Sequence, residues 1–276
     1  MKRLAGLGAL LLAGCASPGH APGPPPGSRY AALGSSYAAG AGIAPRAIDR
    51  PARCRASQVS YPRLLAARLG LRLTDASCGG ATTAHLLAPW NELPAQIEAV
   101  TPETRLVTIT VGGNDIDYMG LMFAASCHAG ATVAPAGGCA ALPASDEAAF
   151  AALEDRLVAI FAAIRSRAPQ ARVVLVQYVA LAGEAPCASA SLLPEHAALA
   201  RSVAARLAEA STTAAERGGA EVLPIDRLSQ DHLPCSDQPW SRGPAAGDDG
   251  SQGAPWHPTA AGHAAIADEL ARLLRG

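Results

Sequence analysis

The protein has 276 residues, the length of one large domain or two small ones. Half of its residues are hydrophobic, 4% are aromatic, and the formal net charge at pH 7 is −1. Its only lysine is Lys2, so no later position can supply the lysine of a Walker A loop, a Schiff base or a Ser-x-x-Lys pair. The nearly neutral charge provides no basic patch, and we expect no nucleic-acid partner.

The first segment indicates export. Lys2 and Arg3 precede an apolar run, residues 4–13, that is typical of a signal peptide and too short to span a bilayer. The stretch Leu-Ala-Gly-Cys at 12–15 resembles a bacterial lipobox, which implies cleavage after residue 14 and a lipid on Cys15. We therefore expect a lipoprotein signal peptide at 1–14 and a lipid anchor in the bacterial cell envelope, on the outer membrane or facing the periplasm in a Gram-negative source. The alternative is an ordinary secretory signal, with Cys15 as a bystander and the protein released.

Residues 15–28 follow the predicted cleavage point and are rich in Pro, Gly, Ser and Ala, which indicates a flexible tether after the lipidated Cys15. Beyond Cys15 the chain has six cysteines. An even number in an exported protein indicates three disulfides, for which 15 pairings are possible. No Cys-x-x-Cys and no His-x-x-x-His occurs, so we expect no metal site.

From residue 29 onward, short apolar runs alternate with longer helical patterns. Strands are predicted at 30–33, 71–76, 106–111, 173–179 and 221–225, and helices at 59–69, 146–168, 194–217 and 258–274. Helices between strands imply right-handed crossovers and a parallel sheet covered on both faces. The sequence therefore predicts one α/β domain over 29–276, a three-layer α/β/α sandwich around a five-stranded parallel sheet.

Residues suited to hydrolysis follow three of these strands and precede the last helix. The four segments are Tyr-Ala-Ala-Leu-Gly-Ser-Ser-Tyr at 30–37, Cys-Gly-Gly-Ala-Thr-Thr at 78–83, Val-Gly-Gly-Asn-Asp at 111–115 and Trp-His-Pro-Thr-Ala-Ala-Gly at 256–262. In a parallel sheet, ligands collect at the carboxyl ends of the strands, so a serine, tight-turn glycines, an amide and a histidine would meet at one edge. In this order the four segments resemble the conserved blocks of the SGNH/GDSL hydrolase family, which implies a flavodoxin-like fold.

The resemblance assigns Ser36 as the nucleophile and His257 as its base. A serine hydroxyl is a weak nucleophile and needs such a base within hydrogen-bond reach. The oxyanion formed on an ester carbonyl needs preorganised donors, which the resemblance places on the N–H of Ser36, the N–H of Gly80 and the side-chain amide of Asn114. No cofactor is implied.

The sequence departs from the family pattern at two positions. Ser35 stands where the first block usually has Asp, a change that we expect to be tolerated. Ala254 stands where the last block usually has the triad Asp, three residues before His257. Some relatives orient the histidine with the main-chain carbonyl at that position, so the Ala254 carbonyl is the expected partner, with Asp248 or Asp249 as the alternative.

Further segments resemble the disulfide-containing secreted esterases and lipases of this family. They include Ser-Tyr-Pro-Arg-Leu-Leu-Ala at 60–66 and His-Leu-Pro-Cys-Ser-Asp-Gln-Pro-Trp at 232–240. Cysteines pair in sequence order in those relatives, which implies Cys54–Cys78, Cys127–Cys139 and Cys187–Cys235.

We therefore predict a lipid-anchored, monomeric serine esterase or lipase, with phospholipase activity as one form of it, acting on ester or lipid substrates. The alternatives are a carbohydrate O-acetyl esterase and a non-catalytic envelope lipoprotein that uses the cleft to bind a ligand. Ser35 is the rival nucleophile, and structural roles are expected for Asp115, His85, His232 and His263. Each of Trp90, Trp240 and Trp256 either packs in the core or lines a substrate pocket.

Overall fold

The computed structural model describes residues 23–131, 137–143, 146–185, 188–244 and 252–275. Five parallel strands form one sheet: β1 (Arg29–Gly34), β2 (Arg72–Asp75), β3 (Thr104–Thr110), β4 (Arg172–Val176) and β5 (Glu221–Leu223). Their order is β2-β1-β3-β4-β5, so β1 and β3 lie at the centre. This is the predicted five-stranded parallel sheet. The predicted fourth strand continued to residue 179, but β4 ends at Val176, where its pairing with β5 also ends.

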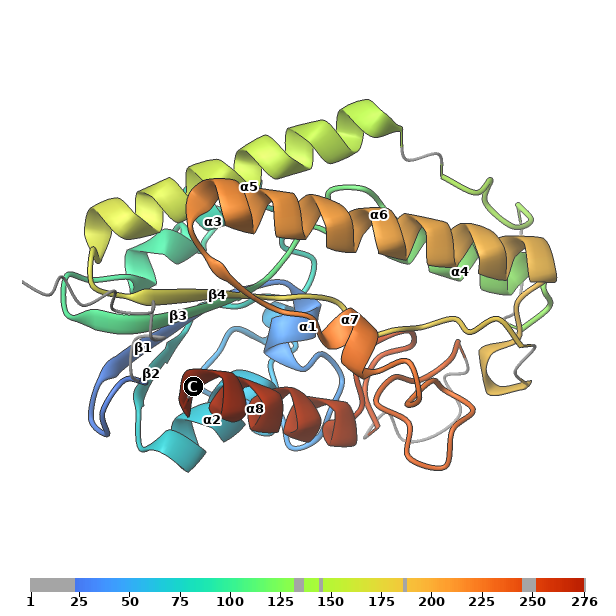
Figure 1. Cartoon of the computed structure of the whole chain (residues 1–276). Coiled ribbons are helices and arrows are strands. Elements are labelled where there is room, and N and C mark those ends of the chain that lie inside the picture. Colours follow the sequence, from blue (N-terminus) through green and yellow to red (C-terminus); the bar gives the residue numbers. More distant parts are fainter. Residues whose placement is uncertain (1–22, 132–136, 144–145, 186–187, 245–251, 276) are drawn as a thin grey trace, which may run out of the picture.

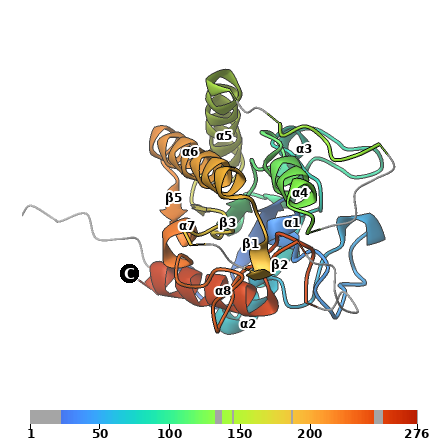
Figure 2. The same ribbon diagram turned by 90° about the vertical axis from the view of Figure 1, so that its right-hand side faces the viewer.

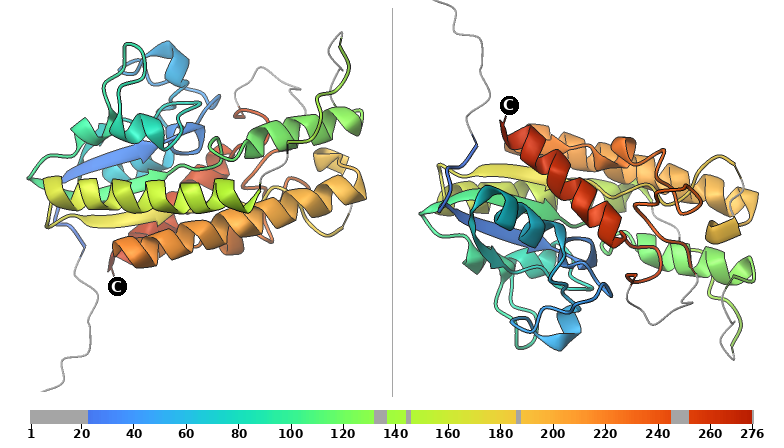
Figure 3. Two further views of the ribbon diagram at one scale, coloured as in Figure 1. Left: turned by 90° about the horizontal axis from the view of Figure 1, so that it is seen from above. Right: turned by 90° about the horizontal axis from the view of Figure 1, so that it is seen from below.

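Helices cover both faces of the sheet (Figures 1 and 2). The long helices α5 (Glu147–Arg167) and α6 (Pro194–Gly218) lie on one face, and α2 (Tyr61–Leu69) and α8 (Ala260–Arg275) pack together on the other. Figure 3 shows the two pairs from above and from below. These are the four helices that the apolar periodicity predicts, and the arrangement is the predicted three-layer sandwich.

Apolar periodicity did not predict four shorter helices. They are α1 (Ser36–Ala39), α3 (Ala84–Leu87), α4 (Tyr118–His128) and α7 (Ile225–Leu228). The chain also forms single 3₁₀ turns at Ala52–Cys54, Gln96–Ala99 and Ala188–Ala190. Three of the four helices have only four residues, too few to show an apolar period. The fourth, α4, has apolar residues on all sides, so it has no polar face to reveal a helical period.

The core is continuous on both sides of the sheet. Buried strand residues such as Leu33 and Ile109 belong to the same hydrophobic cluster as Leu65 of α2 and Phe161 of α5, two helices on opposite faces of the sheet. Burial on both faces explains why β3 from Leu106 onward and β4 from Val173 onward have an aliphatic or β-branched residue at every position.

Two of the three predicted disulfides join described residues. Cys54 is bonded to Cys78, which ties the loop before α2 to the segment after β2. Cys127 at the end of α4 is bonded to Cys139. The third predicted bridge, Cys187–Cys235, involves Cys187, which lies outside the described residues. Cys15 and the predicted signal peptide also lie outside them.

The chain joins the sheet slightly before the predicted domain boundary at residue 29. The N–H of Gly27 donates to the carbonyl of Gly70 at 2.7 Å, and the carbonyl of Ser28 accepts from Arg72 at 2.9 Å. Within the described part of the chain, no helix is long and apolar enough to cross a membrane.

Candidate active site

The predicted nucleophile lies at the carboxyl edge of the sheet. Ser36 is the first residue of α1, directly after the turn that ends β1. In that turn Gly34 has a φ of +138°, and a Cβ there would lie 2.3 Å from the carbonyl oxygen of Thr110 on β3. Only glycine allows this close approach. The turn therefore brings the serine to the start of a helix beside the centre of the sheet.

The side chain of Gln96 holds the same turn. Its Oε1 accepts from the N–H of Gly34 at 2.6 Å, and its Nε2 donates to the Gly34 carbonyl at 3.0 Å. Gln96 is buried and comes from the 3₁₀ turn before β3. The sequence analysis did not find this residue, because nothing in its own segment indicates a contact with residues 62 positions earlier.

Ser36 and His257 form a hydrogen bond. The His257 Nε2 and the Ser36 Oγ are 2.8 Å apart, although the two residues are 221 positions apart in the chain. Both side chains are largely buried, with 9% of Ser36 and 7% of His257 exposed. The structure therefore brings together the two residues that the sequence analysis predicted as nucleophile and base.

The carbonyl that meets the histidine ring belongs to Pro255, and the prediction of Ala254 was wrong by one residue. The His257 Nδ1 lies 2.7 Å from the Pro255 oxygen, whereas the Ala254 carbonyl accepts the backbone N–H of His257 at 3.2 Å. The Pro255 carbonyl thus positions the imidazole ring, and the Ala254 carbonyl positions the backbone of His257. The alternative partners, Asp248 and Asp249, lie outside the described residues.

Burial lowers the pKa of His257 from 6.5 to about 4. The hydrogen bond to Pro255 raises this pKa and the charge of Arg55 lowers it, but loss of solvent dominates. The imidazole is therefore neutral at pH 7. Because Nδ1 faces a carbonyl that can only accept, the proton of the neutral ring sits on Nδ1 and leaves Nε2 free to accept from Ser36.

The other two candidate oxyanion donors, Gly80 and Asn114, come from the segments that follow β2 and β3. The N–H of Cys78 donates to the Gly34 carbonyl at 3.0 Å, which fixes the Gly80 segment to the end of β1. The side-chain amide of Asn114 donates to the carbonyl of Ala81 at 2.9 Å. Among the described residues, no group accepts the backbone N–H of Ser36 or of Gly80, so both are available to a ligand.

Gly80 has a φ of +84°, which favours glycine, and its backbone lies close to the side chain of Trp90. A Cβ at residue 80 would lie 3.3 Å from the indole ring. That ring is stacked between the guanidinium of Arg53, 4.2 Å from its centroid, and the ring of His85, at 4.1 Å. Trp90 and His85 also line a cavity of about 270 Å³ beside Cys78.

Comparison with known proteins places this geometry in a family. A sequence profile of the GDSL-like Lipase/Acylhydrolase family matches residues 32–265. The chain is 32% identical to Lipase 2 of Streptomyces coelicolor over 259 residues, which cover 89% of this chain and 85% of that protein. The chain belongs to the GDSL-like lipase/acylhydrolase family. It is an ester hydrolase of the SGNH type.

Two solved structures are similar over almost their whole length. The extracellular lipase of Streptomyces rimosus has a TM-score of 0.67 and 28% identity, covering 87% of this chain and 98% of that one. Phospholipase A1 of Streptomyces albidoflavus has a TM-score of 0.71 and 24% identity, covering 91% and 100%. This chain therefore shares the fold of these two structures over most of its length.

In this SGNH hydrolase the hydroxyl of the rival nucleophile, Ser35, contacts Tyr178, whereas that of Ser36 contacts His257. The Ser35 hydroxyl lies 3.5 Å from the Tyr178 hydroxyl, which also accepts the N–H of Gly113 at 2.9 Å. Tyr178 in turn packs against Tyr37 with the rings tilted and their centroids 4.4 Å apart, and Tyr37 contacts the His257 ring. The sequence analysis missed both tyrosines, since neither belongs to a charged or metal-ligating pattern.

The other polar residues considered from sequence make structural contacts. His263 accepts the N–H of Tyr61 at 3.0 Å, and His232 stacks on Trp240 with 4.0 Å between ring centroids. Asp115 accepts hydrogen bonds from the backbone and hydroxyl of Thr83 and pairs with Arg156 at 3.5 Å. Within the described ranges, no group of three or more His, Cys, Asp or Glu residues could hold a metal ion.

Proposed function

We propose that Ser36 and His257 hydrolyse carboxylic esters of acyl lipids through an acyl-enzyme. The observation that supports this most is the 2.8 Å hydrogen bond from Ser36 to a histidine whose other nitrogen faces the Pro255 carbonyl. The His257 Nε2 takes the proton as the Ser36 Oγ attacks the ester carbonyl, and the same proton then goes to the leaving alcohol. Water, activated by the same nitrogen, attacks the acyl-enzyme and releases the acid and Ser36.

The developing oxyanion would lie between three donors from three segments. They are the N–H groups of Ser36 and Gly80 and the amide of Asn114. The N–H of Ser36 is at the N-terminus of α1, where the helix dipole adds to the stabilisation of negative charge. Together these groups supply charge stabilisation without a metal or a cofactor.

The experiment is hydrolysis of short- and long-chain p-nitrophenyl esters by the purified protein, beside Ser36→Ala. The matched control is Ser35→Ala, which removes the neighbouring hydroxyl. We expect Ser36→Ala to abolish turnover and fluorophosphonate labelling, and Ser35→Ala to retain both. Turnover that survives Ser36→Ala would contradict the proposed mechanism.

A second candidate function is O-deacetylation of carbohydrates. It is favoured by the fold, which a Corynascus carbohydrate esterase shares with a TM-score of 0.52 at 18% identity. A strict preference for acetyl esters, retained on acetylated sugars, would support it over the lipid esters. Binding of an ester without any Ser36-dependent turnover would instead support a ligand-binding lipoprotein.

We also propose that the protein is exported, lipidated on Cys15 and anchored as a monomer in the cell envelope. The two disulfides between described residues and the similarity to an extracellular lipase support export. Cys15→Ser should move the protein from the detergent phase to the aqueous phase in Triton X-114 partitioning. Wild-type protein in the aqueous phase would contradict the anchor.

A further inference from the structure

Trp256, the residue before the catalytic histidine, has an unusual conformation. Its φ is +58°, in the left-handed region that bulky side chains rarely adopt, and its side chain is fully buried. Strained backbone of this kind persists only where its surroundings fix it, and it is concentrated at functional sites. The question is what this conformation achieves and what holds it.

The conformation brings the Pro255 carbonyl to the His257 ring. The carbonyl lies before Trp256 in the chain and the ring lies after it, so rotation about the N–Cα bond of Trp256 changes their relative position. With φ at +58°, the Pro255 oxygen lies 2.7 Å from the His257 Nδ1. The tautomer and direction of the base therefore depend on the backbone of Trp256.

Two contacts from distant elements hold Trp256 in place. Its indole Nε1 donates to the Ser126 Oγ on α4 at 2.9 Å, in a buried contact across 130 residues. Its carbonyl accepts a short hydrogen bond from the hydroxyl of Tyr37, the residue after the nucleophile.

A second hydrogen bond fixes the orientation of the Ser126 hydroxyl. The hydroxyl donates to the Met122 carbonyl one turn earlier in α4, at 2.7 Å, so its single proton is used and its lone pairs are left to accept the indole N–H. The indole N–H can only donate, so the direction of the bond is fixed.

Resting on the proposed Ser36–His257 mechanism, we infer that Trp256 and Ser126 are positioning residues that hold the base in place of a triad carboxylate. The indole fixes the left-handed turn to α4, the turn aims the Pro255 carbonyl, and the carbonyl orients His257. Neither residue touches the substrate in this scheme.

The test is a double-mutant cycle of Trp256→Phe and Ser126→Ala. The first removes the N–H and keeps an aromatic ring, and the second removes the acceptor. We expect each single variant to lower kcat about tenfold with KM changed less than about twofold, because misalignment of a catalytic group acts on the reaction step. The double variant should lose no more than either single one, because both break the same bond.

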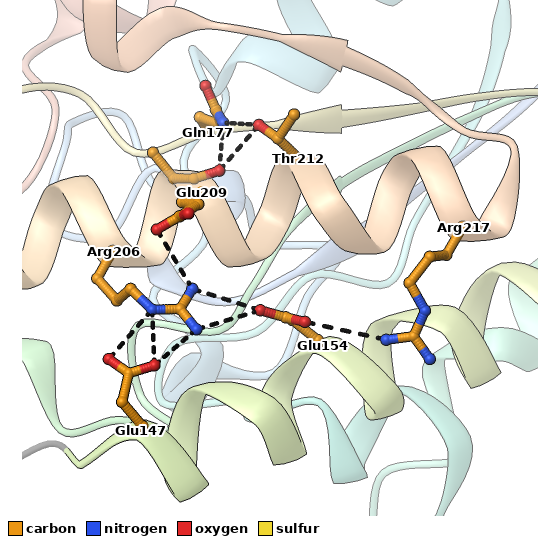
Figure 4. Close-up of polar contacts among 8 residues, drawn as sticks. Glu147, Glu154, Gln177, Arg206, Glu209, Thr212 and Arg217 are labelled. Atoms are coloured by element: carbon orange, nitrogen blue, oxygen red, sulfur yellow. Dashed lines mark hydrogen bonds and ion pairs between the residues drawn. The ribbon is translucent and has the colours of Figure 1, made fainter.

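A matched control exists on α6. The Thr212 hydroxyl also donates to the carbonyl one turn earlier, Ala208 at 2.9 Å, and accepts a side-chain N–H, from Gln177 at 3.1 Å (Figure 4). Thr212→Val removes this pair of contacts on α6, a helix that supplies none of the site residues described above, so it should lower the melting temperature and leave kcat unchanged. Equal kcat losses in Thr212→Val and Ser126→Ala would show a general packing effect and overturn the inference.

A second readout does not depend on turnover. The Nδ1 proton of His257, bonded to Pro255, should give a low-field proton NMR signal that shifts or broadens in Trp256→Phe and Ser126→Ala and stays in Thr212→Val. Wild-type kcat and an unmoved signal in the first two variants would refute the positioning role. If Ser36→Ala also retained turnover, the proposed function itself would fail, so the two failures are distinguishable.

Discussion

At the scale of single residues, the main feature is a histidine held by a carbonyl. A carboxylate beside an imidazole favours its charged form and raises its pKa, whereas the neutral Pro255 carbonyl offsets only part of the effect of burial. His257, the proposed base, thus has a lowered pKa and remains neutral in mild acid.

This predicts an acid-tolerant enzyme. Because the neutral ring accepts the Ser36 proton, kcat/KM should stay level from neutral pH downward and fall only as the pH approaches the pKa of about 4. A pH–rate profile on a neutral ester measures this. A fall in kcat/KM centred near pH 6.5 would contradict this prediction. The control variant His263→Asn should leave the pH at which kcat/KM falls unchanged.

Asn114 gives a second prediction at this scale. If its amide stabilises the oxyanion, Asn114→Ala should lower kcat by about 10²–10³, equivalent to roughly 2.7–4 kcal/mol, with little effect on KM. Steady-state kinetics measure the effects on kcat and KM separately. A large rise in KM at unchanged kcat would place Asn114 in substrate binding instead.

At the scale of elements, α5 and α6 are joined by an ion-pair network (Figure 4). The Arg206 guanidinium lies 2.9 Å from Glu147, 3.3 Å from Glu154 and 3.6 Å from Glu209, and it lies over the ring of Phe150. Glu154 is 16% exposed, whereas Glu147 and Glu209 are 77% and 70% exposed, so the pair with Glu154 is the least screened by water.

We expect Arg206→Ala to lower the free energy of unfolding by about 1–2 kcal/mol, through lost packing as well as lost charge. Glu147→Gln, at the exposed end of the ion-pair network, should lower the free energy of unfolding by less than about 0.5 kcal/mol. Urea unfolding at low and high salt measures both. Esterase activity should be unchanged, and a loss of kcat in Arg206→Ala would contradict a purely structural role for the network.

The elements that the sequence predicted are those with a strong repeating pattern. The five strands and four long helices follow from apolar periodicity, and Ser36 and His257 follow from short motifs. The sequence did not predict α4, whose apolar residues have no helical period, and it placed the histidine partner on Ala254. The second error has a physical cause: the left-handed turn at Trp256 shifts the contact by one residue, and no local rule predicts that turn for a tryptophan.

At the scale of the whole molecule, two buried neutral histidines link stability to pH. Burial lowers the pKa of His257 to about 4 and of His263 to about 3. As the pH falls, the two histidines therefore take up protons near pH 6.5 in the unfolded chain, before they do so in the folded chain. The stability that the neutral histidines contribute is complete above pH 6.5 and is lost as the pH falls toward 4.

We expect the free energy of unfolding to fall by up to about 3 kcal/mol per histidine between pH 6.5 and 4. Buried Asp75, whose pKa is raised by loss of solvent, acts in the opposite direction, so the useful quantity is a difference between variants. His263→Asn keeps an acceptor near the Nδ1 position for Tyr61 and removes one titrating ring. Chemical denaturation should show a shallower pH dependence in this variant, and an unchanged slope would contradict the assignment.

The two ends of the described chain leave from the same side of the molecule. Gly23 packs against Leu274 near the end of α8, and Arg29 starts β1 at the amino edge of the sheet (Figure 1). Ser36 lies at the other edge, about 20 Å away along the six residues of β1. The described chain therefore starts and ends on the side of the molecule opposite Ser36. A protein fused at either end of the domain would therefore be joined on the side opposite Ser36 and would leave the carboxyl edge of the sheet uncovered.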